Sequence, residues 1–190
     1  MKRFFTADYH FNHTNILDFE KRPFKNVTQM NSEIIRRHNE RVKAEDKVYF
    51  LGDFIFGKNP AQFLQQMNGR WHFICGNHDR NNGLKTRIEQ MALRIGGIKT
   101  QLVHNPEFAS IDYQLILCGH VHSRFKVKEL KYCGKRSLLI NVGVDVWNYA
   151  PIEWSEIQSI YTRWESEKKK VNKFEEPKIL KKLNVWSNNG

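Results

Sequence analysis

Five short apolar runs in this chain each end in a cluster of Asp, Asn, His or Gly residues, and this repeated arrangement most constrains the fold. The runs have the length and composition of β-strands. They lie at Arg3–Thr6, Val48–Leu51, Trp71–Cys75, Lys99–Val103 and Tyr113–Leu117. Helical patterns between some of them favour an α/β domain with mixed β-sheets flanked by helices. Because ligands in such sheets bind where strands end and loops begin, we expect an active site at the strand ends.

Three segments between the strands are predicted as helices. Asn31–Ala44 carries apolar residues on one side, and Leu84–Leu93 is a second candidate. Asn59–Met67 has Pro60 at the first helical position, Asn59 as its N-cap and Gly69 just past its end. The sequence therefore predicts helices on the faces of the sheet.

After His122 the pattern changes to a hairpin and a final helix. Phe125–Leu130 and Ser137–Val142 flank Cys133-Gly134-Lys135, which is typical of a β-hairpin with Gly in the turn. A helix is predicted from Ser155, where Ser155 and Gln158 match a capping box. Its apolar residues recur at helical spacing, which favours core packing over a base-stacking platform. They are Ile157, Ile160, Tyr161 and Trp164.

Length and charge place further limits on the protein. With 190 residues, we expect one domain over residues 1–170 and a basic C-terminal tail over 171–190 that is partly ordered at most. The net charge of +11 attracts polyanions such as nucleic acid, although a solvated lysine-rich helix end explains part of it. No apolar run approaches the roughly 20 residues of a membrane span, and the start is too short for a secretory signal. We therefore expect a cytoplasmic protein with no membrane partner.

Cysteine usage agrees with a reducing compartment. The three cysteines, Cys75, Cys118 and Cys133, are far apart and form no CxxC pair. A zinc finger or a dithiol site is therefore not expected.

The polar clusters carry side chains that bind metals. Carboxylates and imidazoles bind divalent first-row metals, and an Asn carbonyl oxygen can complete the set. Each residue alone would more often be a capping Asp, a core His or a turn Asn, whereas the five clusters together favour a metal site. Seven ligand-type residues are enough for two ions that share one carboxylate. They are Asp8, His10, Asp53, Asn77, His104, His120 and His122.

The order of these motifs resembles a known family. The series DxH, GD, GNHD, H and GHxH runs from Asp8 to His122 as in the calcineurin-like metallophosphoesterase superfamily, and GNHD and GHVH are its most specific pieces. The neighbouring pieces HFNHTNI, RPF, RHN and GDFIFG are most similar to a small prokaryotic and phage branch. The resemblance covers most of the chain and fades after about Trp154. It implies a layered phosphoesterase fold.

The resemblance also implies a role for each residue of the motifs. One metal would be bound by Asp8, His10, Asp53 and His122. The second would be bound by Asp53, Asn77, His104 and His120, with Asp53 bridging the two. His78 matches the histidine that contacts the phosphoryl oxygen or protonates the leaving group, and Asp79 would orient and charge its imidazole.

Other polar residues near the motifs have more than one interpretation. His13 could contact substrate or lie on the surface, and Arg124 could clamp a phosphate. Asn141 and Asp145 could return to the edge of the site or shape a turn, and the turn is favoured.

The function expected from the sequence is metal-dependent hydrolysis of phosphoesters by a hydroxide between two divalent ions. We expect Mn, with Fe, Co, Ni and Zn as alternatives. No large insertion separates the motifs, so an open site is expected that suits small or flexible substrates, diesters before monoesters. A nuclease for single-stranded DNA or RNA is the alternative that the basic charge favours. A non-catalytic, metal-bearing module that binds polyanions is a third, and the presence of His78 and Asp79 speaks against it. The sequence leaves the oligomeric state open.

Overall fold

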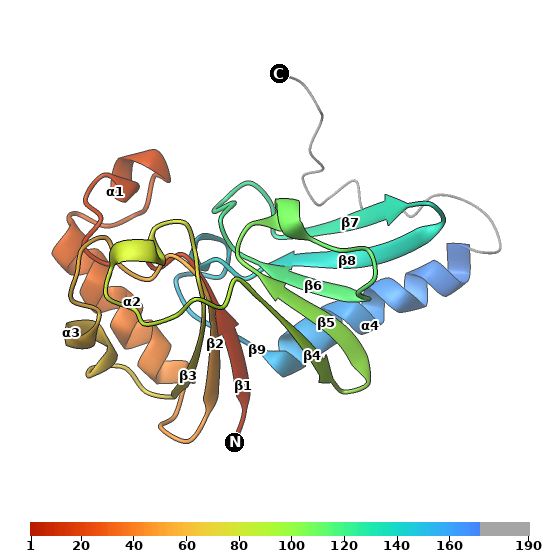
Figure 1. Ribbon diagram of the computed structural model, residues 1–190, viewed down its shortest axis with the longest axis horizontal. Helices are drawn as coiled ribbons and strands as arrows, with labels where there is room; N and C mark the ends of the chain where they lie inside the picture. Colours follow the sequence, from red (N-terminus) through yellow and green to blue (C-terminus); the bar gives the residue numbers. More distant parts are fainter. Residues whose placement is uncertain (172–190) are drawn as a thin grey trace.

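A computed structural model describes residues 1–171 as two β-sheets that pack against each other, with helices outside them (Figure 1). The four-stranded sheet has the order β3-β2-β1-β9, and the five-stranded sheet has the order β4-β5-β6-β8-β7. The strands are β1 (Arg3–Thr6), β2 (Lys47–Leu51), β3 (Arg70–Ile74), β4 (Gln90–Ile95), β5 (Ile98–Val103), β6 (Leu115–Cys118), β7 (Val127–Tyr132), β8 (Lys135–Asn141) and β9 (Ile152–Glu153). The α-helices are α1 (Ile16–Phe19), α2 (Val27–Arg41), α3 (Ala61–Leu64) and α4 (Trp154–Val171). This arrangement confirms the predicted α/β class with helix-flanked mixed sheets.

The four-stranded sheet is buried on both faces. Successive side chains of a strand point to opposite sides, so each strand contributes to two cores. In β2, Tyr49 and Leu51 face the core between the two sheets. Val48 and Phe50 face the side that α2 covers. Consecutive apolar residues of β2 are therefore all buried, as is typical of strands covered on both faces.

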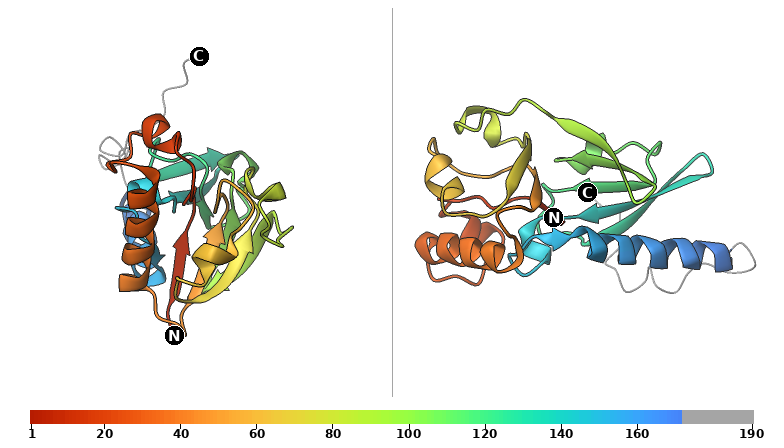
Figure 2. Two further views of the ribbon diagram at one scale, coloured as in Figure 1. Left: turned by 90° about the vertical axis from the view of Figure 1, so that its left-hand side faces the viewer. Right: turned by 90° about the horizontal axis from the view of Figure 1, so that it is seen from below.

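Helix α2 covers the outer face of the four-stranded sheet (Figure 2). It begins earlier than predicted, because the side chain of Asn26 caps it by accepting a hydrogen bond from the Gln29 backbone N–H at 2.9 Å. Met30, Ile34 and His38 form its buried stripe at a spacing of four residues. The cap at Asn26 fixes the start that the apolar pattern alone placed at residue 31.

Helix α4 packs against the core that the two sheets share. Its residues Ile157, Tyr161 and Trp164 are buried there, which confirms the prediction of a core stripe. The helix begins at Trp154, and the predicted pair of Ser155 and Gln158 is not its capping box. Instead, the carboxylate of Glu156 accepts the backbone N–H of Glu153 at 2.9 Å.

Two helix predictions between the sheets need correction. Leu84–Leu93 is not helical: β4 begins at Gln90 and pairs antiparallel with β5 across the Gly96-Gly97 turn. Side chains in β4 alternate between exposed and partly buried, which is a period of two. Helix α3 spans only Ala61–Leu64, and Pro60 precedes it as the N-cap.

The two sheets meet where the carboxyl ends of their parallel strands lie. Strands β1, β2 and β3 are mutually parallel, and so are β5, β6 and β8. Beyond β1 and β8, Ala7 pairs with Gly143, and the Val144 N–H donates to the Ala7 carbonyl at 3.2 Å. Loops from both sheets therefore open onto one shared edge.

Two features of the chain need only brief mention. None of the helices in residues 1–171 combines the length and the apolar character that crossing a membrane requires. The basic tail predicted over 171–190 lies outside the described residues from position 172 onward.

Candidate metal centre

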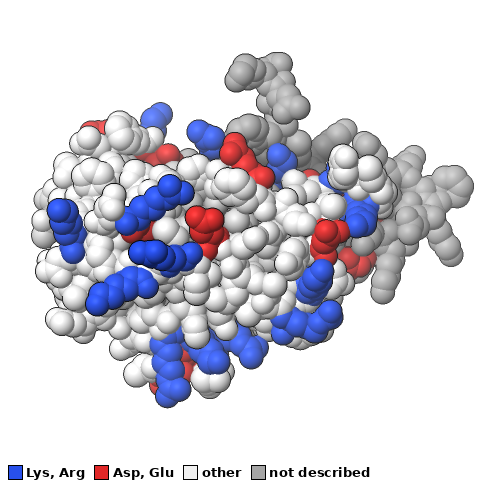
Figure 3. Space-filling model, viewed as in Figure 1, with Lys and Arg blue, Asp and Glu red and all other residues white. Residues whose placement is uncertain are grey.

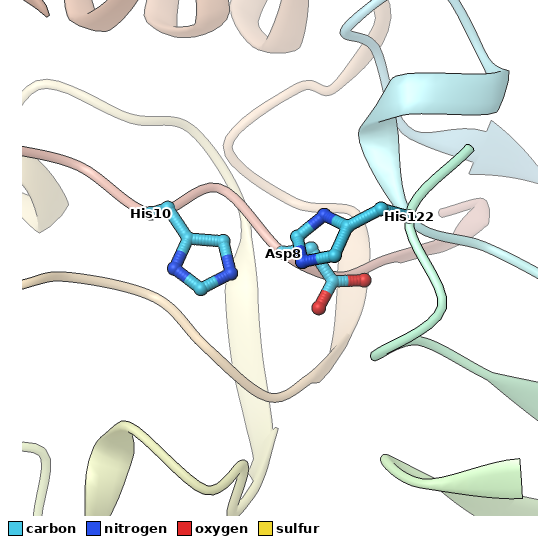
Figure 4. Close-up of side chains that lie close together, drawn as sticks. All are labelled: Asp8, His10 and His122. Atoms are coloured by element: carbon cyan, nitrogen blue, oxygen red, sulfur yellow. The ribbon is translucent and has the colours of Figure 1, made fainter. Parts of the chain in front are cut away.

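The shared edge brings the predicted ligands together in two clusters, and a further group of possible ligands, His10, Asp53 and His78, overlaps both sets of loops. Asp8 and His10 lie in the loop after β1 and His122 in the loop after β6, with ligand atoms within 4.8 Å of one another (Figure 4). The second cluster joins three loops in the same way, again within 4.8 Å. It consists of Asp53, His104 and His120.

Asp53 connects the two clusters. Its Oδ2 atom lies 3.3 Å from Nε2 of His104 and 3.6 Å from Nε2 of His10. Oδ1 of Asn77 lies 3.0 Å from Nε2 of His104 and 3.0 Å from Nδ1 of His120. The seven side chains that the sequence singles out therefore converge, and Asp53 lies between the two clusters.

The backbone of these loops is unusual in a way that marks the site. Five ligand residues adopt the left-handed region, which costs about 1–2 kcal/mol for a residue with a Cβ atom. They are Asp8 (φ 60°), His10 (φ 52°), Asp53 (φ 62°), His120 (φ 70°) and His122 (φ 45°). Such residues concentrate at functional sites, where the surrounding structure holds the strain. Here the strain turns the side chains of separate loops toward a common space.

Two glycines allow the loops to approach this closely. A Cβ atom on Gly76 would lie 2.1 Å from Oδ1 of Asp53, and one on Gly119 would lie 2.7 Å from Oδ2 of Asp8. Any side chain at either position would displace a ligand carboxylate. The glycines of the GNHD and GHVH motifs are thus required by close packing.

The environment of His10 tests whether this site fits a metal. Its ring is 2% exposed, and neither ring nitrogen has a hydrogen-bond partner among the described residues. Burial holds the pKa of His10 well below its ordinary value, so the imidazole is neutral with a free lone pair. Buried polar atoms normally have a partner, and a bound cation would supply it.

The rings of two further histidines, His104 and His122, are oriented by a hydrogen bond from the ring nitrogen Nδ1. Nδ1 of His104 donates to the Leu51 carbonyl at 2.7 Å, which leaves Nε2 facing Asp53 and Asn77. Nδ1 of His122 pairs with Oδ2 of Asp145 at 2.9 Å. Metal-binding histidines are commonly fixed in this way by a carbonyl or a carboxylate. The mixed nitrogen and oxygen set suits divalent first-row metals.

Charges in the site are strongly coupled before any cation binds. Burial raises the pKa of Asp8 above its ordinary value. Burial would also raise the pKa of Asp53, but the hydrogen bond and charge of His104 hold it well below its usual range. In return, Asp53 and Asp8 raise the pKa of His104 despite its burial. Positive charge is therefore favoured beside Asp8 and Asp53, and in the metal-free protein the proton on His104 supplies it.

Metal affinity should therefore increase with pH through the neutral range. Despite burial, hydrogen bonding to Asp53 and the charges of Asp8 and Asp53 raise the pKa of His104 to about 9, so His104 is protonated at pH 7, whereas a ligand imidazole must be neutral. Below the raised pKa, binding displaces this proton, and affinity falls by up to about tenfold for each pH unit lowered. Titration calorimetry in buffers of different ionisation enthalpy measures the released proton. An affinity that is flat between pH 6 and 8 would contradict this expectation.

Comparison with known proteins agrees with the geometry. A sequence profile described as the calcineurin-like phosphoesterase superfamily domain matches residues 1–149. The chain belongs to this superfamily. The resemblance seen in the sequence motifs is therefore confirmed, and the matched region contains all seven candidate ligands.

Relatives of the phosphoesterase domain span most of the chain. An uncharacterized protein of Methanocaldococcus jannaschii, MJ1445, is 38% identical over 157 residues, which cover 80% of this chain and 86% of the relative. A crystal structure of a protein of unknown function from Aquifex aeolicus, AQ665, superposes with a TM-score of 0.65 at 24% identity. The superposition covers 84% of this chain and 98% of the Aquifex chain, and it supports the same overall fold for the two proteins.

Sequence reasoning did not assign the residues that form hydrogen bonds to the ligand residues of this phosphoesterase site. We favoured a turn for Asp145, but its carboxylate contacts His122 and also accepts from Nε of Arg22 at 2.8 Å. The buried Arg22 guanidinium donates further to the Asp8 carbonyl at 2.8 Å. Asn141 likewise returns to the site, where its Nδ2 donates to the His122 carbonyl at 2.7 Å. The available signal was that Asn141 is the last residue of β8 and Asp145 follows it, so both lie near a strand end as the ligands do.

Asp79 has a different role from the predicted one. Its carboxylate accepts the backbone N–H groups of Asp53 (2.7 Å), Phe54 (3.0 Å) and Gly76 (2.8 Å), and Nδ2 of Asn82 at 2.6 Å. None of these bonds reaches the imidazole of His78. Asp79 therefore ties together the loops after β2 and β3 that carry metal ligands, and does not orient His78.

The remaining predicted residues lie around the clusters. The His13 ring lies 5.5 Å from the His10 ring and 6.2 Å from the His78 ring, between centroids. His78 is exposed, and its backbone N–H donates to Oδ1 of Asp53 at 2.9 Å. Arg124 is exposed two residues beyond His122, and its contact with phosphate stays a prediction.

Proposed function

We propose that this protein is a dinuclear metal-dependent phosphodiesterase that acts on small or flexible phosphoesters. The observation that carries the proposal is the position of Asp53 between two clusters of ligand atoms. When bound there, two divalent ions supply an activated water and neutralise charge on the phosphate. Hydrolysis breaks one P–O bond, adds the water oxygen to phosphorus and releases an alkoxide, which takes up a proton to become an alcohol.

His78 is the candidate for that proton transfer. Its ring lies 5.2 Å from the ring of His10, on the exposed side of the clusters. The bond from its backbone to Asp53 fixes its Cα, while the exposed imidazole is left to contact the phosphoryl oxygen or the leaving alkoxide. A positioned imidazole contributes typically 10²–10⁴-fold to such reactions.

His13 is suited to hold the substrate. Its Nδ1 atom accepts the backbone N–H of Ile16 at 3.0 Å, so in the neutral ring the proton is on Nε2. Burial lowers the pKa of His13, which favours that neutral form. The Nε2–H group is thereby available to donate to a phosphate oxygen next to His78 and His10.

A diester is favoured over a monoester because space is available beside the metal centre for a second ester group. A pocket of about 430 Å³ borders Asn77, His104 and His120. A phosphate bound at the two clusters could extend one substituent into this pocket and another into solvent.

Metal removal and restoration test the proposed function. After chelation, we expect no hydrolysis of bis-p-nitrophenyl phosphate, and we expect Mn²⁺ to restore it more than Fe²⁺, Co²⁺, Ni²⁺ or Zn²⁺. A monoester panel run in parallel measures the diester preference. If the metal-loaded protein is inert toward every ester yet binds a polyanion tightly, the non-catalytic alternative is correct.

His78→Ala should lower kcat by about 10²–10⁴-fold while both metals stay bound, because His78 is not one of the seven proposed ligands, although it lies within reach of His10 and Asp53. Steady-state kinetics and metal analysis of the same sample measure the two quantities. His72→Ala is the matched control, since His72 stacks on Tyr49 away from the clusters. A loss of metal in the His78 variant would assign it to coordination.

A further inference from the structure

A trough leads away from the second cluster along the segment between β3 and β4. The pocket of about 430 Å³ beside His104 and His120 is continued by another of about 670 Å³. The two pockets share Cys75, Arg80 and Glu89 in their walls. Together they form one depression that runs outward from the site of the proposed reaction.

Three cations line the walls of this trough, against one carboxylate, Glu89, that borders both pockets. Arg80, Lys85 and Arg87 are exposed, and none forms an ion pair or side-chain hydrogen bond with any residue in the described part of the chain. By contrast, Arg36 and Arg37 on α2 both pair with Glu33. Figure 3 shows several basic side chains, with acidic ones beside them, on the face that the β3–β4 segment occupies in Figure 1. These cations are available to bind an anionic ligand.

The inner pocket, the one of about 430 Å³ beside His104 and His120, also has a solvent-exposed aromatic ring in its wall. Phe108 is 69% exposed, although its backbone is held in a 3-10 turn, Pro106–Phe108. The Phe108 carbonyl accepts from Nε2 of Gln101 at 3.1 Å, and its N–H donates to the Asn105 carbonyl at 3.1 Å. A ring on a fixed backbone loses little entropy when a ligand stacks on it. Core packing does not explain a phenylalanine at this position.

We infer that this trough binds a single-stranded nucleic acid next to the phosphodiester that is cleaved. One base stacks on Phe108, and flanking phosphates contact Arg80, then Lys85 and Arg87. The inference rests on the proposed function, and it names the substrate class of the same site. A mononucleotide is too short to reach the outer pocket, and a paired base has its faces covered by neighbours, so an unpaired strand fits best.

The outer cations provide a test that leaves the metal centre intact. We compare wild type with Lys85→Gln/Arg87→Gln, using a fluorescent oligo(dT) of eight nucleotides and bis-p-nitrophenyl phosphate. Lys43→Gln/Arg70→Gln is the control, because it removes the same charges at the opposite ends of the strands. The full-length chain is used throughout, so any binding by the basic tail is common to all variants.

In the trough variant we expect roughly tenfold weaker oligonucleotide binding, measured by anisotropy after chelation. The slope of log affinity against log salt should become shallower by about 1.4, since two phosphate contacts to a single strand are lost. With Mn²⁺ added, kcat/KM for the oligonucleotide should fall similarly, while that for the small diester is unchanged. The control should match wild type in oligonucleotide affinity, in the salt slope and in both kcat/KM values.

Phe108 tests the stacking contact. Phe108→Ala should lower oligonucleotide kcat/KM by roughly tenfold, and Phe108→Trp should restore it, since an indole also stacks on a base. A merely structural role would not be rescued by the larger ring.

The outcomes separate this inference from the proposed function. If the small diester is cleaved but the trough and control variants bind oligonucleotide equally, the trough inference is overturned and the phosphodiesterase stands. A kcat/KM that is independent of chain length beyond one nucleotide would also overturn it. If no ester is cleaved with any metal, the proposed function fails, whatever the binding data show.

Discussion

We expect Asp53→Asn to reduce kcat toward a phosphodiester by about 10²–10³-fold or more and to lower the bound metal below two ions per chain. The carboxylate faces His10 of one cluster and His104 of the other, so its charge serves both. An amide keeps the shape of the side chain but removes the charge that balances two cations in a buried site. Metal analysis after dialysis and steady-state kinetics with Mn²⁺ measure the two effects.

Asp46→Asn is the matched control for Asp53→Asn. Asp46 is also buried, at 2% exposure, but it accepts the backbone N–H groups of Lys2 and Lys43 at the opposite end of the sheet. Its replacement should change stability without changing metal content. If Asp53→Asn retains two metals and wild-type turnover, Asp53 does not bridge them, and the proposed site is wrong.

Asp79→Ala should lower the free energy of unfolding by about 3–5 kcal/mol. The change leaves three buried backbone N–H groups without an acceptor, and each unsatisfied buried donor costs about 1–3 kcal/mol. Because these groups belong to the loops that carry Asp53 and Asn77, metal affinity should fall as well. Urea denaturation of the metal-free protein measures the stability, and titration calorimetry measures the affinity.

The control for Asp79→Ala is Asp112→Ala, which removes an exposed carboxylate paired with Lys135 and should cost about 1 kcal/mol or less. Asp79→Asn should be intermediate, since its carbonyl oxygen can still accept some of the bonds. Unchanged stability together with a shifted pH profile of kcat would return Asp79 to the role of orienting His78.

The local pattern of the chain was enough to predict five strands and the seven candidate ligands that follow them. Apolar runs followed by Asp, Asn or His marked the ends of β1, β2, β3, β5 and β6, because strand burial and loop polarity are properties of neighbouring residues. Local patterns were less reliable for helices. Leu84–Leu93 became a loop and β4, since pairing with β5 across two glycines outweighed a weak helical pattern.

Contacts between distant segments could be known only from the tertiary structure. The sequence by itself determined the α/β class, the superfamily motifs and the seven candidate ligands, because each depends on residues close together in the chain. The fold decided that Arg22 and Asp145, 123 positions apart, brace the site, and that Asp79 holds loops together rather than an imidazole. It also placed Phe108 and Arg80 on one trough. Hydrogen bonds and pockets of this kind arise only when the two sheets pack, since no spacing along the chain encodes which buried donor a carboxylate will meet.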